Sequence, residues 1–515
     1  MKRTLASLLG AASALAVAQA SPAAAAERDE VRLRKALTVD NILKHERAFQ
    51  EIATRSGGNR AAGTVGYDRS ARYVADQLRA AGYSVRAQTF QFPFFEETGT
   101  PTFARVSPNP QTFTVGTDFS TGTYSGDGDV TGRLVPTNDI VIPPTAAPSS
   151  TSGCEAADYP AAPAGPAVAL IQRGTCTFQE KAEAAAAAGY DAAIIFNEGQ
   201  EGRQELLIGT LGAPQSIPVI FAPFALGQEL FQQASARAVT VRVATDVISE
   251  TRTTRNVLAD TAGGRVDRVV VVGAHLDSVA EGPGINDNGS GSSTILEIAL
   301  QMKRLNIKPF NKVRFAFWGA EELGLLGSEF YVQSLSTRQQ RNIDVNLNFD
   351  MVGSPNYARF VYDGDGSITP DVTTDGGPIG SDTVEQVFLD YFEDRGLATE
   401  PTPFDGRSDY GPFIAVGIPA GGLFSGAEGI KTPEQAAKFG GRAGIAFDPC
   451  YHQACDTIRN VSRKALDELG DGAAHAVVRF AQRIDAVSVR ADGQAAARTR
   501  RSRDSFLYRG GLLQK

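Results

Sequence analysis

The sequence has no apolar run long enough to cross a bilayer, and it is short of basic residues. Because a spanning helix needs about 20 apolar residues in succession, we expect no membrane span. Lysine and arginine number 50 against 58 aspartates and glutamates, and seven of those 50 fall within residues 490–515. The rest of the chain is therefore more acidic still, which predicts that it has no nucleic-acid partner.

The first 26 residues have the pattern of a secretory signal peptide. Lys2 and Arg3 precede an apolar run from Leu5 to Val17, and small residues follow, with candidate cleavage sites after Ala20 and at Ala26. The run is too short for a membrane helix. We expect residues 1–26 to be removed and the protein to be secreted, to an extracellular or periplasmic location. The alternative is an ordinary alanine-rich helix.

Cysteine is scarce, and an even number in an exported chain indicates disulfides. The four cysteines are Cys154, Cys176, Cys450 and Cys455. Three pairings are possible. Sequence separation favours Cys154–Cys176 and Cys450–Cys455, each of which would close a local loop.

The length allows two or three domains, and much of the chain alternates between helix and strand patterns, which indicates an α/β fold. Helices are predicted near residues 39–55 and 67–81. Between about 100 and 250 the composition shifts to Gly, Thr, Pro and short strands, which indicates an inserted accessory domain. The α/β pattern resumes at Asn256 and ends with a helix near 462–486.

The stretch from Val269 to Asp287 is the most informative in the chain. Four consecutive valines predict a fully buried strand of the parallel kind. His275, Asp277 and Asp287 follow on a loop rich in Gly, Pro and Asn. Ligand sites in open α/β sheets lie at the carboxyl ends of strands. The pattern favours a metal site there, with a hydrogen-bonded loop as the alternative.

Two further predicted strands end in acidic side chains. The strand at 312–318 is followed by the pair Glu321 and Glu322, and the strand at 344–349 is followed by Asp350. A glutamate pair can be a solvated pair at a helix start. Its company at neighbouring strand ends favours a metal site instead.

Histidine is scarce as well, and two of the four histidines accompany these carboxylates. His275 ends the valine strand, and His452 lies between two cysteines. His45 and His475 lie within predicted helices, and we expect them to be surface or core residues.

Two imidazoles and three or four carboxylates suit zinc, whereas a calcium site prefers oxygen ligands alone. Because that many ligands exceed the set of one tetrahedral ion, we expect two ions that share a carboxylate, about 3.5–4 Å apart. One of the two glutamates can then act as general base. Asp277, two residues from His275, is placed to orient that imidazole.

The motifs GAHLDSV, GINDNGSG, FWGAEELGLLGS, NFDMVG and CYHQAC closely resemble those of the secreted di-zinc aminopeptidases, and those of the bacterial leucyl aminopeptidases most of all. The likeness extends over residues 37–95 and 250–485 and includes GGNRAAGTVGY. Residues 126–246 resemble a protease-associated domain. The family fold is a mixed, mostly parallel sheet flanked by helices, here with that smaller α/β domain inserted.

The resemblance implies a division of the chain into five segments: a signal peptide at 1–26, two parts of the catalytic domain at 27–125 and 247–487, the protease-associated domain at 126–246, and a basic C-terminal tail at 488–515.

The resemblance also implies how two zinc ions are held. His275 and Asp350 would bind one ion, and Glu322 and His452 would bind the other. Asp287 would bridge the two.

The remaining implied roles concern the substrate. Glu321 would be the general base, and Tyr451 would donate to the oxyanion of the tetrahedral intermediate. Met351 and Phe424 would form walls of the pocket for the first side chain. Arg407 would lie where the amino end of the substrate is held.

Two departures from the family pattern bear on detail. Tyr410 stands where a histidine is common in relatives, which affects fine specificity rather than chemistry. Some relatives bind a structural calcium, for which Asp467 and Asp471 would be candidates. Ala36 replaces an acidic partner there, and we do not expect that ion.

The implied function is removal of one residue, apolar and leucine-like, from peptides with a free N-terminus. The alternatives on this fold are a carboxypeptidase, a dipeptidase, a glutaminyl cyclase and a non-catalytic binding or scaffold protein. A site for a C-terminal carboxylate would place several arginines near the pocket, and only Arg407 and Arg442 are available.

Overall fold

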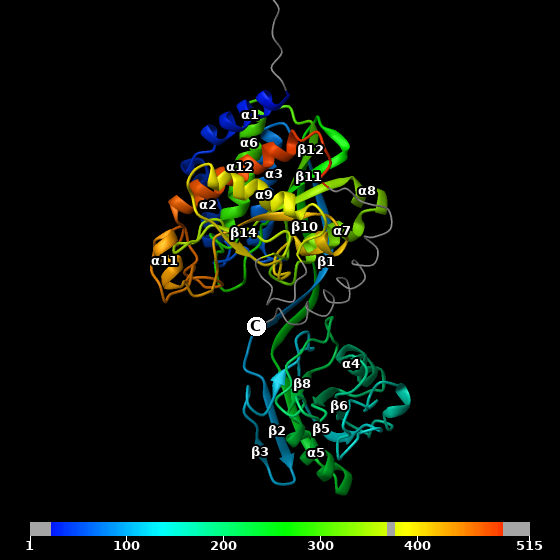
Figure 1. Ribbon diagram of the computed structural model, residues 1–515. Coiled ribbons are helices and arrows are strands. Elements are labelled where there is room, and N and C mark those ends of the chain that lie inside the picture. The colour runs from blue at the N-terminus through cyan, green and yellow to red at the C-terminus, as the bar shows by residue number, and fades with distance from the viewer. Residues whose placement is uncertain (1–21, 368–375, 488–515) are drawn as a thin grey trace, which may run out of the picture. The chain divides into compact units, whose positions relative to one another are not determined.

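A computed structural model describes residues 22–367 and 376–487, and the chain forms two compact units (Figure 1). Within these ranges the first unit comprises residues 22–87 and 256–487, and the second comprises residues 88–255. The predicted tail at 488–515 and most of the predicted signal peptide lie outside the described residues. No helix among the described residues is long and apolar enough to cross a membrane.

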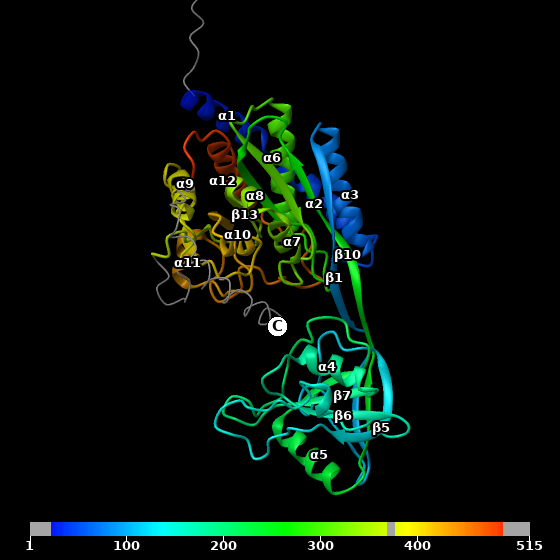
Figure 2. The same ribbon diagram turned by 90° about the vertical axis from the view of Figure 1, so that its right-hand side faces the viewer.

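The first unit is built on an eight-stranded mixed sheet. Its strands, in spatial order, are β1 (Ser84–Glu97), β10 (Val247–Asp260), β12 (Asn311–Trp318), β11 (Arg265–His275), β13 (Ile343–Phe349), β16 (Ala420–Phe424), β14 (Phe360–Tyr362) and β15 (Glu400–Thr402). The central strands β12, β11, β13 and β16 are mutually parallel, while β10 and β14 pair antiparallel to their inner neighbours. The predicted mixed, mostly parallel sheet is confirmed. The long strands β1 and β10 carry the chain into and out of the second unit (Figure 2).

The valines of β11 are buried on both faces of this sheet. Val270 and Val272 belong to one core cluster and Val269 and Val271 to another, because successive strand residues point to opposite faces. All four are at most 6% exposed. The predicted fully buried strand is therefore confirmed, and its end is held rigidly from two sides.

Helices cover both faces. Those on the first face include α6 (Gly289–Arg304) and α12 (Arg463–Ala481), with α1 (Pro22–Ala36), α2 (Val39–Thr54), α3 (Val65–Ala80) and α9 (Ser381–Glu393) around them. On the other face, α7 (Leu326–Ser334) and α10 (Gly411–Ala415) pack over the sheet around Trp318. The remaining helices of this unit are α8 (Thr337–Asn342) and α11 (Pro433–Phe439). Helices α2 and α3 begin where the side chains of Thr38 and Thr64 accept from backbone N–H groups of the first turn.

The second unit has its own eight-stranded sheet and core. In spatial order its strands are β3 (Gln111–Thr112), β2 (Thr102–Ser107), β9 (Thr240–Thr245), β5 (Gly128–Pro136), β6 (Ala167–Gln172), β7 (Ala192–Phe196), β8 (Val219–Ala222) and β4 (Ser120–Thr121). Two α-helices, α4 (Phe178–Ala187) and α5 (Phe224–Ala236), and the short 3-10 helix η1 (Ala156–Asp158) complete it. The predicted domain limits 126 and 246 fall inside this unit, whose sheet also contains β2, β3 and β4 from the part of the chain before residue 126.

Both predicted disulfide pairings are confirmed. Cys154–Cys176 lies in the second unit, and Cys450–Cys455 lies in the first.

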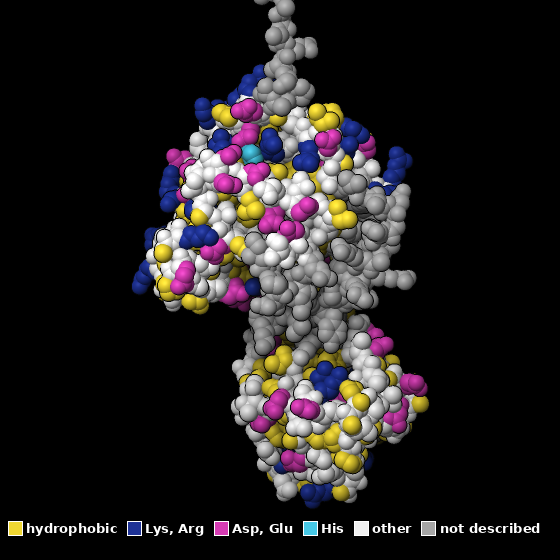
Figure 3. Space-filling model, in the orientation of Figure 1, with side chains coloured by type: hydrophobic (Ala, Val, Ile, Leu, Met, Phe, Trp, Pro, Cys, Tyr) yellow, Lys and Arg dark blue, Asp and Glu magenta, His cyan; other side chains and the backbone are white. Residues whose placement is uncertain are grey.

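On the face shown in Figure 3, acidic and basic side chains are interspersed over both units.

Val271→Ala should lower the free energy of unfolding of the first unit by about 2 kcal/mol, because it removes two methyl groups from a fully buried site and leaves a cavity. Val266→Ala is the matched control, since Val266 is on the same strand and 67% exposed; its effect should stay within about 0.5 kcal/mol. Chemical denaturation followed by fluorescence of the single tryptophan, Trp318, measures both. Equal losses would contradict the burial of Val271.

Candidate metal centre

The predicted ligands meet because neighbouring parallel strands end at the same edge of the sheet. β11 ends at His275, which is in register with Trp318 at the end of β12. Asp350 follows β13, the neighbour of β11 on its other side. Glu321 and Glu322 follow Trp318 by three and four residues.

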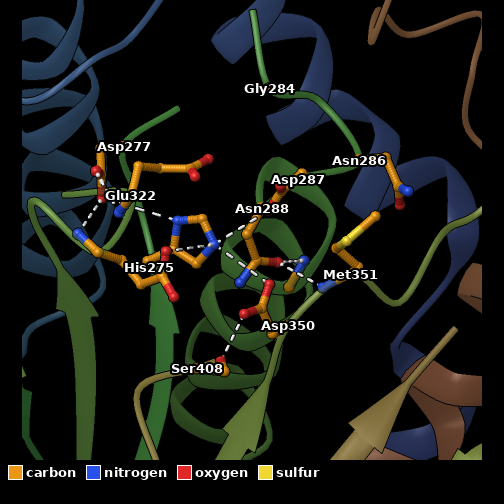
Figure 4. A network of polar contacts seen from close by, with 12 residues as sticks. His275, Asp277, Gly284, Asn286, Asp287, Asn288, Glu322, Asp350, Met351 and Ser408 are labelled. Atoms are coloured by element: carbon orange, nitrogen blue, oxygen red, sulfur yellow. Dashed lines mark hydrogen bonds and ion pairs between the residues drawn. The ribbon is translucent and has the colours of Figure 1, made fainter. Parts of the chain in front are cut away.

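His275 faces two carboxylates at once. Its Nε2 atom lies 3.2 Å from Asp287 Oδ1 and 3.2 Å from Asp350 Oδ1, and Glu321 Oε2 lies at 3.9 Å (Figure 4). One ring N–H cannot lie along both of the shorter directions. A cation between these atoms would satisfy all of them.

His452 faces a second pair of carboxylates. Its Nε2 atom lies 3.2 Å from Asp287 Oδ2 and 3.0 Å from Glu322 Oε2. The two oxygens of Asp287 thus face two different imidazoles. The side chain of His275 is 1% exposed and that of His452 is 38% exposed, so one half of the centre is deep and the other is open.

A short cystine ring, closed by the disulfide between Cys450 and Cys455, holds the open half of the centre. Cys450 and Cys455 enclose Tyr451 and His452, whose rings stack at 3.8 Å. His452 has a left-handed backbone, with φ +56°, which few non-glycine residues adopt. The cystine ring also packs closely on Gly282: a Cβ added at Gly282 would lie 2.2 Å from the backbone oxygen of Gln453, which belongs to that ring. The cystine ring therefore fixes the direction of the His452 side chain.

Asn288 connects the Asp287 loop to the end of β13. Its side-chain NH₂ donates to the Phe349 carbonyl at 2.9 Å, while its Oδ1 accepts from the backbone N–H groups of Gly291 and Met351. Helix α6 can approach this closely only because Gly291 lacks a side chain: a Cβ there would lie 2.1 Å from the Phe349 oxygen. These contacts hold Asp287 against Asp350.

Asp277 lies behind the centre, but not as a direct partner of His275. Its Oδ1 is 3.7 Å from His275 Nδ1, which is longer than a hydrogen bond. Its two oxygens accept instead from the backbone N–H groups of Glu321 and Glu322, at 3.2 and 3.3 Å. Asp277 thus positions the glutamate pair relative to β11. Its predicted action on the imidazole stays a prediction.

Ser408 was not among the predicted site residues. Its hydroxyl donates to Asp350 Oδ2 at 2.5 Å, which orients that carboxylate. Ser408 lies in the GRSDYGPF motif, but a hydroxyl in a loop gives no sequence signal of this role. The next residue, Asp409, is fully buried, and burial raises its pKa to about 8.

The pKa values of the centre show an excess of buried negative charge. Burial raises the pKa of Glu322 to about 7 and that of Glu321 well above its usual value. Burial lowers the pKa of His452, but the carboxylates of Asp287 and Glu322 beside its Nε2 outweigh this and raise it to about 10. Carboxylates that are forced towards their protonated forms indicate a place for additional positive charge.

The donor set fits zinc. Zinc takes imidazole nitrogen and carboxylate oxygen, and ligand atoms about 2.0–2.1 Å from a tetrahedral ion lie roughly 3.3 Å apart. The observed separations around His275 Nε2 and His452 Nε2 are 3.0–3.2 Å. These separations are compatible with a metal ion beside each histidine, and Asp287 has one oxygen near each of them.

A pocket opens beside the centre. All three predicted substrate residues, Met351, Arg407 and Phe424, belong to its lining. Sequence reasoning missed the others, which come from loops and from the ends of the short strands β14 and β15, where the sequence carries no recognisable signal: Tyr362, Thr402, Pro403, Asp405, Ser408 and Ala427. Arg407 donates to Glu428 Oε1 at 2.8 Å and to Tyr451 Oη at 3.3 Å.

The candidate calcium ligands lie elsewhere, on α12. Asp471 Oδ2 is 3.3 Å from Arg34 Nη1, so a guanidinium neutralises this carboxylate. His475, on the same helix, pairs with Glu30 at 2.9 Å, and His45 contacts Tyr73 and Glu297 within the helix layer.

Comparison with known proteins gives relatives for both units. Residues 256–477 match peptidase family M28, and residues 130–230 match the PA domain. The chain is 46% identical over 445 residues to an aminopeptidase of Pseudomonas aeruginosa, covering 86% of this chain and 81% of that protein. It is 41% identical over 440 residues to a probable leucine aminopeptidase 2 of Aspergillus fumigatus, covering 84% and 81%. Among solved structures, a zinc aminopeptidase from Bacillus subtilis is 26% identical with a TM-score of 0.52, covering 86% of this chain and 94% of that one.

Glu46 gives a pH test of the buried acids behind the centre. Burial raises its pKa well above the usual value, nearby Asp456 adds to the rise, and neither Glu46 oxygen has a hydrogen-bond partner. The folded protein therefore holds a proton that the unfolded chain releases above its ordinary pKa, so stability falls as the pH rises from there.

Glu46→Gln keeps the shape of the side chain but is neutral at every pH. The difference in Tm between this variant and the unsubstituted protein should therefore be more favourable to the variant at pH 8 than at pH 5. Glu51→Gln, at an exposed position of the same helix, should show no such difference. Calorimetry of the metal-free proteins measures both, and a gain that is equal at the two pH values would be inconsistent with this account.

Proposed function

Because the chain belongs to peptidase family M28, carries a PA domain and is a zinc metallo-aminopeptidase acting on peptides, we propose that it removes an apolar, leucine-like residue from a free N-terminus with two zinc ions. One observation carries the two-ion proposal: the two oxygens of Asp287 face the Nε2 atoms of two different histidines. In a single-ion site, one of the two histidines would have no metal ion to bind.

We assign His275 and Asp350 to the deep ion, Glu322 and His452 to the open ion, and Asp287 to both. The distances within each set support this assignment. When bound, zinc polarises the scissile carbonyl and lowers the pKa of water.

Glu321 is the proposed general base. Its carboxylate is buried beside the deep half of the centre, and Asp277 holds its backbone. It would take a proton from the attacking water and pass it to the departing amine. A raised pKa suits the first of these steps, because a more basic carboxylate takes the proton more readily.

Tyr451 is the proposed donor to the oxyanion of the tetrahedral intermediate. Arg407 already donates to the phenol oxygen, so the phenol proton is left for another acceptor. The stacking of Tyr451 on His452 keeps its hydroxyl beside the open half of the centre. A fixed donor of this kind favours the transition state because it needs no reorganisation.

The charges around the pocket favour an amine over a carboxylate as the recognised end of the substrate. Asp350, Glu321 and Asp405 contribute carboxylates to the lining. Arg407 is already paired with Glu428, and Arg442 is not among the lining residues. A free ammonium group therefore finds partners here, which supports an aminopeptidase over a carboxypeptidase. Met351 and Phe424 would contact the apolar first side chain.

We propose that the protein is exported and that its signal peptide is cleaved after Ala20. Two disulfides support export. Cleavage after Ala20 would leave α1 whole, whereas cleavage at Ala26 would remove its first turn. Glu30 and Arg34 of α1 pair with α12, so the helix belongs to the fold. With cleavage after Ala20, the first part of the peptidase domain would begin at residue 21 rather than at the predicted residue 27. We keep the other predicted limits as proposals: 126–246 for the PA domain, 247–487 for the rest of the peptidase domain, and 488–515 for a tail.

Leucine p-nitroanilide and its N-acetyl analogue test the proposal. Only the free amine should be hydrolysed. Glu321→Gln should lower kcat by about 10²–10⁴-fold, because the general base is lost, while the zinc content stays at two per chain. Hydrolysis of both anilides would indicate an enzyme that does not read the amino end. No hydrolysis by the zinc-loaded protein would favour a cyclase or a binding protein.

The cystine ring gives a second test, with a matched control in the other unit. Cys450→Ser/Cys455→Ser should lose zinc from the open position and lower kcat/KM by roughly 10–100-fold, because the ring orients His452 and Tyr451. Cys154→Ser/Cys176→Ser removes the other disulfide and should leave zinc content and kcat/KM near those of the unsubstituted enzyme. Zinc analysis and anilide hydrolysis measure both, and equal effects would show that the ring has no special part.

A further inference from the structure

Arg60 is a fully buried cation directly behind the loop that carries Asp277 and Asp287. It lies between α2 and α3, far from this loop in the sequence. Burial lowers the pKa of Arg60 to about 10, while Asp277, Asp456 and Asp287 oppose this shift and favour the charged form. A guanidinium at this pKa is charged at neutral pH.

The side chain of Arg60 contacts both ends of one loop. Its Nε donates to the Pro283 carbonyl at 2.9 Å, and its two terminal nitrogens donate to the carbonyls of Leu276 and Gly284. The backbone N–H of Arg60 donates to Ser278 Oγ at 2.9 Å. Residue 276 follows the end of β11, and Gly284 lies on the approach to Asp287 (Figure 4). The guanidinium therefore closes the loop across its base.

The charge of Arg60 also matches the centre. Asp277, Asp287, Glu321, Glu322 and Asp350 bring five carboxylates, and two divalent cations leave one negative charge uncompensated. Because the donors of Arg60 meet carbonyl oxygens rather than a carboxylate, its positive charge remains available to this cluster.

We propose that Arg60 is a positioning residue, which shapes the loop at 276–288 before zinc binds and thereby sets the affinity for zinc. This inference rests on the proposed two-zinc function. Arg60 touches neither the ligand atoms nor the substrate pocket, so it acts through the backbone that carries Asp277 and Asp287.

Hydrogen exchange of the metal-free, unsubstituted protein tests the first part without any variant. Backbone N–H groups of the loop are already bonded, including Ile285 and Asn286 to Asp456 and Gly289 to Gly284. Peptides spanning 276–289 should be protected from exchange in the absence of zinc. Exchange as fast as in an unstructured chain would overturn the proposal, because the loop would then be shaped by the metal.

The affinity for zinc tests the second part. Arg60→Lys keeps a positive charge but cannot reach three carbonyls, so zinc affinity in competition with a chelator should fall at least tenfold. Rate constants at saturating zinc should recover towards those of the unsubstituted enzyme.

Arg359→Lys is the matched control: Arg359 is a buried arginine of the same unit that bonds to Glu468 and to the Ala398 carbonyl. It should leave zinc affinity unchanged. Unchanged affinity in folded Arg60→Lys would overturn the proposal. If that variant does not fold, Ser278→Ala, which removes a weaker contact of the same link, should still reduce zinc affinity. A protein that binds no zinc at all would contradict the proposed function instead, while the exchange measurement would still report on the loop.

Discussion

The sharing of Asp287 between two imidazoles is the constraint on which the rest of the structure depends. One Asp287 oxygen lies 3.2 Å from His275 Nε2 and the other lies 3.2 Å from His452 Nε2, so the stretch from His275 to Asp287 must meet a loop that is distant in the sequence. The fold meets this requirement with rigid parts. A strand buried on both faces ends at His275, a helix begins just after Asp287, and a cystine ring holds His452.

This convergence concentrates acidic groups in a largely buried site, which is unfavourable without compensation. The structure compensates with backbone N–H groups and with cations. Asp456 accepts from the N–H groups of Asn286 and Asp287, Asp277 accepts from the glutamate pair, and Arg60 brings a buried positive charge. What remains is an excess of negative charge that suits divalent cations. Burial, together with the neighbouring carboxylates, raises the pKa values of Glu321 and Glu322.

Much of this arrangement could be predicted from the sequence. The valine run, the acidic residues that follow two strands and the histidine between two cysteines each carry a local signal, and parallel strands bring such ends together by geometry. The contacts of Ser408 and Arg60 could not be predicted, because a serine in a loop and an arginine between helices look like ordinary surface residues. The distance of Asp277 from His275 was also beyond the sequence, since a spacing of two does not fix where a side chain points. Pocket residues such as Pro403 and Asp405 come from a loop whose path depends on the whole fold.

Anomalous diffraction from crystals of the zinc-loaded enzyme, recorded on both sides of the zinc absorption edge, tests the central claim most directly. The account predicts two zinc peaks about 3.5–4 Å apart, with one Asp287 oxygen bound to each and one histidine on each side. A single peak, or two peaks without Asp287 between them, would contradict it.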